Sequence, residues 1–146
     1  MPDILHMVGI KSSSPDGTYR ALTTAEGLAA WWTTETHVKG DGTIQFRFGG
    51  DNGFDMKVLA LEPARHVLWQ VIGGPEEWVG TRIDWQIGHD NNYTMLRFKH
   101  EGWREPVDFM YHCSTKWAMF LMSLKSLVET GKGAPWPEDI KIHEAH

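Results

Sequence analysis

Residues 105–133 read EPVDFMYHCSTKWAMFLMSLKSLVETGKG, and this stretch decides the fold. At 100° per residue, its large apolar side chains fall within about a third of the helical circle. The stretch therefore predicts one long helix over residues 105–128 with a wide apolar stripe. Pro106 suits the first turn, where a missing N–H costs nothing. Gly131 or Gly133 provides a left-handed stop.

Upstream of this helix, from residue 36 on, apolar residues recur with a period of two, which is typical of strands. The pattern predicts a first strand at 4–10 and further strands at 43–49, 54–62, 66–72, 81–88 and 93–101. In segment 58–61 every residue is apolar, including those that point to opposite faces of a strand, which indicates a bulge or a strand covered on both faces. Asp84 falls on the outer face, where we expect it to pair with Arg82 or Arg97.

Residues 15–33 predict two short helices in tandem. Thr23 and Glu26 have the spacing of a capping box for the second helix, with Thr23 as the cap. The strands that follow form an antiparallel meander with one apolar face, and the long helix is the predicted element wide enough to cover it. We expect an α+β fold in which a curved antiparallel sheet of about six or seven strands wraps around the C-terminal helix, with the two short helices after the first strand.

Composition excludes several classes of protein. The 146 residues are typical of a single domain over 1–146. A net charge of −5 argues against nucleic acid as a partner, since phosphate contacts need clustered Lys and Arg. No window approaches the roughly 20 apolar residues of a membrane span, and the start lacks a secretory pattern. With one cysteine there is no internal disulfide. We therefore expect a cytoplasmic protein without a membrane partner.

Four segments carry a resemblance to a known family. They are ALT at 21–23 with LAAWW at 28–32, VLALEP at 58–63 with LW at 68–69, LRFKHEGW at 96–103, and WAMFLMSLKSLVETG at 117–131. Their order and spacing resemble the family related to the activator of the 90-kDa heat-shock protein ATPase, a branch of the START-like (SRPBCC) superfamily, over residues 3–137. The resemblance implies a helix-grip fold, the name of that superfamily's architecture.

The chain departs from the family pattern at Ala64, where a second Pro is common, and at Lys116, where a Gly often precedes the helix Trp. The eukaryotic activators also carry a separate N-terminal domain that engages the chaperone, and this chain has no room for it. The resemblance therefore implies the fold more firmly than it implies chaperone activation.

On each predicted strand, the alternate residues that face the helix are rich in aromatic side chains. They predict an aromatic-rich lining between the sheet and the helix, which is the usual form of a small-molecule site. The alternative is that these side chains simply fill the interior. His100, Thr94 and Thr81 share the inward parity and could orient a ligand, although a structural role for His100 is equally consistent with the pattern. The predicted ligand-binding residues are Phe46, Phe48, Trp69, Trp85, Phe98, His100, Phe109, Cys113, Trp117 and Phe120.

Catalytic and metal chemistry have weaker support. Cys113 lies on the apolar stripe, where a small inert hydrophobe is expected. No inner-face carboxylate pair is readable, so we assign no catalytic residue. The scattered histidines, His143 and His146 included, match no zinc spacing, and we predict neither metal nor cofactor. The tail after Trp136 is expected to be loosely ordered.

The leading hypothesis is non-catalytic binding of a small hydrophobic or aromatic molecule. The first alternative is a protein-interaction module whose partner is a chaperone or a second copy of the chain. Its surface would be the off-stripe apolar residues of the long helix, for which packing against the short helices is the favoured alternative: Tyr111, Ala118, Met119 and Met122. The second alternative is an enzyme of the cyclase or hydratase kind.

Overall fold

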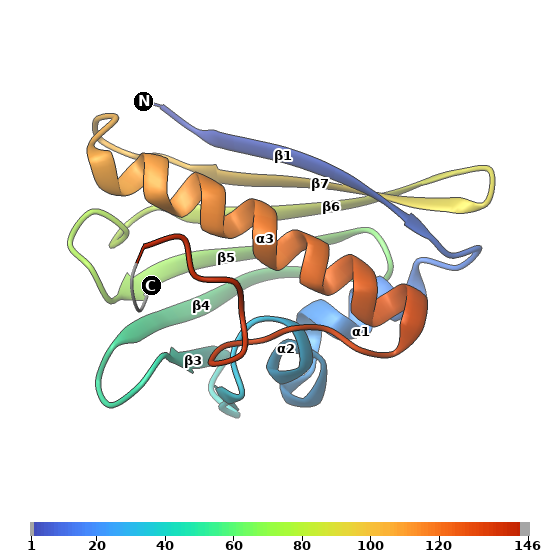
Figure 1. Ribbon diagram of the computed structural model, residues 1–146, viewed down its shortest axis with the longest axis horizontal. Coiled ribbons are helices and arrows are strands. Elements are labelled where there is room, and N and C mark those ends of the chain that lie inside the picture. The colour runs from blue at the N-terminus through green and yellow to red at the C-terminus, as the bar shows by residue number, and fades with distance from the viewer. Residues whose placement is uncertain (1, 144–146) are drawn as a thin grey trace.

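In the computed structural model, which describes residues 2–143, one antiparallel sheet curls around a long helix (Figure 1). The elements follow in the order β1 (Ile4–Lys11), α1 (Asp16–Thr23), α2 (Ala25–Trp31), β2 (Glu35–Val38), β3 (Thr43–Arg47), β4 (Gly53–Glu62), β5 (His66–Gly73), β6 (Arg82–Asp90), β7 (Tyr93–Glu101) and α3 (Asp108–Thr130). The predicted α+β helix-grip fold is confirmed. None of the helices in the described part combines the length and apolar character that crossing a membrane requires.

The seven strands are ordered β1-β7-β6-β5-β4-β3-β2, so β1 and β2 form the edges. Neighbouring strands from β2 to β7 are consecutive in the chain, and every pairing is antiparallel. The β4–β5 register shifts between Val58 and Ala60, at the segment where the sequence indicated a bulge. The short edge strand β2 was not assigned from the sequence, because its four residues carry no clear alternation.

Helix α3 lies across the concave face of the sheet, with α1 and α2 near its C-terminal end (Figure 1). Its buried residues face the sheet, among them Trp117, Leu121 and Leu124. The helix begins at Asp108, so the prediction that Pro106 occupies its first turn is wrong. Val107 is extended, with ψ at 166°, and thereby separates Pro106 from the helix. Gly131 ends α3 in the left-handed conformation, with φ at 86°, as predicted.

The junction of α1 and α2 also differs from the prediction. Thr24, and not Thr23, caps α2, and its hydroxyl accepts a hydrogen bond from the Gly27 N–H at 3.0 Å. Thr23 is the last residue of α1, and its hydroxyl instead donates to the Tyr19 carbonyl. Thr24 is free to cap because it is the residue with extended backbone geometry.

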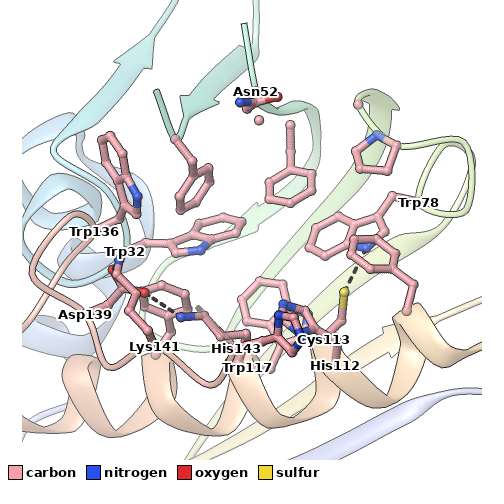
Figure 2. A pocket seen from close by; sticks show the side chains of 18 of the residues that line it. Trp32, Asn52, Trp78, His112, Cys113, Trp117, Trp136, Asp139, Lys141 and His143 are labelled. Carbon is pink, nitrogen blue, oxygen red and sulfur yellow. Dashed lines mark hydrogen bonds and ion pairs between the residues drawn. The ribbon is translucent and has the colours of Figure 1, made fainter. Parts of the chain in front are cut away.

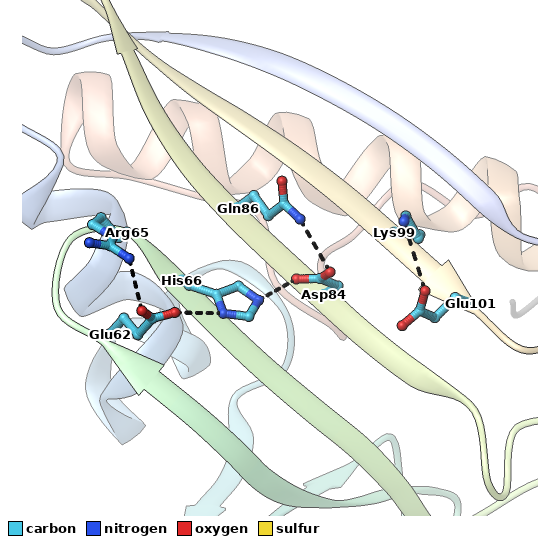
Figure 3. A network of polar contacts seen from close by, with 7 residues as sticks. All are labelled: Glu62, Arg65, His66, Asp84, Gln86, Lys99 and Glu101. Carbon is cyan, nitrogen blue, oxygen red and sulfur yellow. Dashed lines mark hydrogen bonds and ion pairs between the residues drawn. The ribbon is translucent and has the colours of Figure 1, made fainter.

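A polar network covers part of the outer face of the sheet (Figure 3). The His66 ring lies between two carboxylates, 3.0 Å from Glu62 and 2.6 Å from Asp84. The predicted pairing of Asp84 with Arg82 or Arg97 is therefore wrong. The cross-strand register explains it, because Leu68 is the residue opposite Asp84 on β5, and His66 lies two positions along on the same face.

Candidate functional site

A cavity of about 980 Å³ opens between α3, the end of the sheet near β3 and β4, and the C-terminal tail (Figure 2). Eight of the side chains that line it are Phe or Trp, and they come from well-separated parts of the chain. The lining residues are Trp32, Phe48, Asp51, Asn52, Gly53, Phe54, Gly74, Pro75, Trp78, Phe109, His112, Cys113, Lys116, Trp117, Phe120, Trp136, Asp139, Lys141 and His143.

The aromatic wall is a packed set of rings. Phe54 from β4 stacks on Trp78 from the β5–β6 loop, with ring centroids 3.8 Å apart. Trp117 of α3 contacts Trp78 at 5.8 Å and Trp32, the residue that follows α2, at 4.9 Å. Rings in such contact hold one another in place. The wall is therefore preformed and offers flat apolar ring surfaces to the cavity.

Trp117 connects this wall to a buried polar chain. Its indole N–H donates to Nδ1 of His100 at 3.1 Å, so Nδ1 carries no proton. Nε2 of His100 must then carry the proton, and it donates to the Thr81 hydroxyl at 2.8 Å. The Thr81 hydroxyl donates in turn to the Trp78 carbonyl at 2.6 Å. Burial lowers the pKa of His100 to about 3, so the ring is neutral at physiological pH.

Cys113 is a wall residue with little nucleophilic character. Burial raises the pKa of its thiol to about 12, and the hydrogen bond that Sγ accepts from the Trp78 indole N–H, at 3.3 Å, opposes this only in part. The thiolate is the reactive form, so Cys113 is unreactive near pH 7. With both nitrogens of His100 already in use, these two groups do not form a nucleophile–base pair.

One side of the cavity is polar and is built by α3 and the tail. Lys116 Nζ contacts the Asp139 carboxylate at 2.5 Å and the Ile140 carbonyl at 2.9 Å. It also lies 5.0 Å from the centroid of the Phe120 ring. Lys141 pairs with the same Asp139. Burial acts to raise the pKa of Asp139, but the hydrogen bonds from Lys116 and Lys141 outweigh it and hold the pKa below its usual value.

The tail is held in place before it reaches this side. The Trp136 N–H donates to the Trp32 carbonyl at 2.8 Å, and the Thr34 N–H donates to the Trp136 carbonyl at 3.2 Å. From residue 137 to 143 the tail forms neither helix nor strand and is mostly exposed. The expectation of a loosely ordered tail after Trp136 stays a prediction, and residues 144–146 lie outside the described part of the chain. The side chain of Asp139 is only 5% exposed because it enters the cavity and pairs with two lysines.

Ten residues were predicted to bind a ligand, and the structure divides them into two sets of five. Phe48, Phe109, Cys113, Trp117 and Phe120 line the cavity. The other five are buried in the core and do not line it: Phe46, Trp69, Trp85, Phe98 and His100. Period-two alternation identifies the inner face of every strand, but it does not show how far along each strand the cavity extends.

The two threonines considered as ligand-orienting groups have other partners. Thr81 belongs to the His100 chain. The Thr94 hydroxyl donates to the carbonyls of Ser12 and Ser14, at 3.2 and 3.4 Å, so it holds the segment that follows β1.

Several cavity residues were not assigned from the sequence. Trp32 lies in the segment 15–33 that predicts two short helices, Trp78 lies in the loop between β5 and β6, and Trp136 lies just before the tail. Each enters the cavity through tertiary packing. The sequence feature that could have identified these residues is the unusual number of Trp, eight in 146 residues, some of them at loop positions. Within residues 2–143, no three His, Cys, Asp or Glu side chains lie together as a metal site requires. His146 lies outside the described residues.

Comparison with known proteins confirms the family predicted from the sequence. Residues 12–129 match the family described as Activator of Hsp90 ATPase homolog 1-like protein. No curated protein matches the chain.

Among solved structures, the chain is similar to the Aha1 dimer from Colwellia psychrerythraea, with 49% identity, a TM-score of 0.83, and coverage of 91% of this chain and 100% of that chain. CalU16 from Micromonospora echinospora shares the fold at 20% identity, with a TM-score of 0.69 and coverage of 93% and 78%. DynU16, from the dynemicin biosynthetic locus, shares it at 22% identity, with a TM-score of 0.72 and coverage of 90% and 48%.

Proposed function

We propose that this chain, which belongs to the family of Activator of Hsp90 ATPase homolog 1-like proteins, binds a small hydrophobic or aromatic molecule in the cavity between its sheet and α3. One observation carries the proposal: the cavity has about 980 Å³ of space behind an aromatic wall. That volume lies in the upper part of the range found for small-molecule sites. We further propose a cytoplasmic location, as the single cysteine suggests.

The first test is native mass spectrometry of the protein purified gently from its own source, compared with its denatured mass. A reproducible extra mass that is lost on denaturation identifies a retained ligand. Because a ligand held at about micromolar affinity dissociates during purification, the same protein is also titrated with N-phenyl-1-naphthylamine, an uncharged aromatic probe.

The probe's position is read from the eight indole N–H signals in a ¹H–¹⁵N spectrum. Four tryptophans line the cavity, namely Trp32, Trp78, Trp117 and Trp136. We expect their signals to shift most. Equal shifts of all eight signals, or shifts confined to the other four, contradict binding in the cavity.

A matched pair of variants on α3 tests the wall itself. Phe109 lines the cavity, whereas Tyr111, two residues later, is 70% exposed and lies outside it. Phe109→Ala removes one ring of the wall and should weaken probe binding roughly tenfold, the factor that about 1.4 kcal/mol represents. Tyr111→Ala should leave the affinity unchanged, and an equal effect of the two variants contradicts the proposal.

A second candidate function is a protein-interaction module with self-association. It is favoured by the 49% identity to a structure described as a dimer and by the family's link to the Hsp90 ATPase. Two of the off-stripe residues of α3 are exposed, Tyr111 at 70% and Met122 at 54%, and supply an apolar surface.

Sedimentation velocity at micromolar concentration separates the two functions. The second candidate predicts a dimer that Met122→Glu dissociates and that Phe109→Ala leaves intact. A monomer at all concentrations excludes self-association. Absence of binding to an Hsp90-type ATPase in the same experiment excludes the chaperone partner.

A further inference from the structure

The polar side of the cavity contains Lys116, a lysine whose charged group is largely buried. The side chain of Lys116 is 15% exposed and lies against the Phe120 ring. A largely buried ammonium is stable only with an anionic or strongly polar partner. In this structure Asp139 and the Ile140 carbonyl provide that partner, and both belong to the tail.

The tail reaches Lys116 from a separate anchor. Its backbone is fixed at Trp136 by the two hydrogen bonds to Trp32 and Thr34, and at Ala134, whose N–H donates to the Ser123 hydroxyl at 2.7 Å. Asp139 lies three residues beyond the last of these contacts. Its carboxylate can therefore leave Lys116 without disturbing the anchor, because the bonds at 134 and 136 do not depend on it.

The charges on the cavity wall balance only while Asp139 is counted. The lining contains two lysines, Lys116 and Lys141, and two aspartates, Asp51 and Asp139. Both lysines pair with Asp139. Once that carboxylate moves out, the ammonium group of Lys116, which belongs to α3, is left without its carboxylate partner next to the aromatic wall. An apolar ring surface beside an ammonium group is complementary to an aromatic molecule that carries an anion.

Resting on the proposed ligand-binding function, we infer that the cavity selects aromatic molecules with an anionic group, such as a carboxylate, and that Asp139 occupies the anion's position at Lys116 until such a ligand replaces it. The aromatic part lies against Trp32, Trp78 and Trp117. The anionic group pairs with Lys116. Asp139 is thus an internal competitor that lowers the affinity for anionic ligands and leaves the affinity for neutral ones unchanged.

The experiment uses two probes with one ring system. 1-Anilinonaphthalene-8-sulfonate carries an anion, and N-phenyl-1-naphthylamine is the same scaffold without it. Dissociation constants for both are measured by fluorescence titration, and the indole N–H signals show whether each probe is in the cavity. The full chain is compared with Lys116→Gln, Asp139→Asn and Lys57→Gln, where Lys57 is an exposed residue of β4 outside the cavity.

We expect Lys116→Gln to weaken binding of the anionic probe at least about tenfold, as the loss of a charge-assisted hydrogen bond implies. Asp139→Asn should strengthen it by a similar factor. The dissociation constant of the neutral probe should change less than about twofold in both variants. Lys57→Gln makes the same change in net charge as Lys116→Gln. If the site selects the anion, and not the overall charge of the protein, Lys57→Gln should leave the affinities for both probes unchanged.

The outcomes separate this inference from the function on which it rests. If both probes enter the cavity with affinities that Lys116→Gln changes equally, the anion selectivity is wrong and the cavity function stands. The anion selectivity is also wrong if Lys57→Gln weakens the anionic probe as much as Lys116→Gln does. If neither probe shifts the cavity indoles, the proposed function fails, and the inference fails with it. The lysine variant keeps the test decisive even if Asp139→Asn releases the tail.

Discussion

The His100 side chain is fully buried, and the residues around it allow only one protonation state. The Trp117 indole N–H points at Nδ1, so a proton added there would face another donor. Thr81 uses its hydroxyl proton on the Trp78 carbonyl, so it accepts from Nε2. The neutral ring therefore links β7, the β5–β6 loop and α3, and protonation breaks that link.

The free energy of unfolding should consequently depend on pH through His100. The unfolded chain binds a proton at this residue with a pKa near 6.5, whereas burial lowers the pKa in the folded state to about 3. Acid therefore favours the unfolded chain. The stabilisation is complete above pH 6.5 and is lost as pH falls from 6.5 toward 3, with a slope of up to about 1.4 kcal/mol per pH unit.

Guanidinium denaturation at pH 7.5, 6.0 and 5.0 measures this slope, in a window above the range where most carboxylates titrate. His100→Gln removes the titrating ring and should flatten the dependence, although it lowers stability at pH 7.5. Parallel curves for the two proteins rule out His100 as the source.

At the scale of the element, α1 and α2 are joined by one residue with two hydrogen bonds. The Thr24 hydroxyl accepts from the Gly27 N–H at 3.0 Å and donates to the Arg20 carbonyl at 2.8 Å. The same hydroxyl therefore caps the start of α2 and contacts the last turn of α1. Helices of eight and seven residues have little stability of their own, so this junction matters to both.

Thr24→Ala should lower the free energy of unfolding by about 1 kcal/mol, the usual cost of losing an N-cap. Thr23→Ala is the matched control, because Thr23 is the neighbouring residue and its hydroxyl bonds only the Tyr19 carbonyl within its own helix. Its loss should cost less than about 0.5 kcal/mol. Urea denaturation of both variants measures the difference, and a larger loss at Thr23 contradicts the assignment of the cap.

At the scale of the whole molecule, the helix and the sheet are held together by rings. Trp117 contacts Phe98 of β7 at 4.6 Å, Trp85 of β6 at 6.0 Å and the Trp32 ring at 4.9 Å. The same residue lines the cavity and bonds His100. Removing it therefore disturbs core and cavity together, which is why the binding experiments use Phe109 and Lys116 instead.

The sequence by itself determined the arrangement of elements and the family. The apolar stripe of 109–128 and the alternation in 43–48, 66–71 and 93–100 each arise from the geometry of a single helix or strand. Local periodicity therefore identified them, and it also gave the inward direction of His100 and Trp117. It erred where neighbouring residues compete for one role, as Thr23 and Thr24 do for the cap of α2, and where a partner lies on another strand, as His66 does for Asp84.

Only the tertiary structure decided where the cavity lies and what charges face it. Trp32, Trp78 and Trp136 are about 50 residues apart in the chain and carry no shared pattern, yet packing brings their rings to one wall. The pairing of Lys116 with Asp139 spans 23 residues and depends on the path of the tail past α2. Contacts of this kind arise from how the elements pack together, and no period along the chain encodes them.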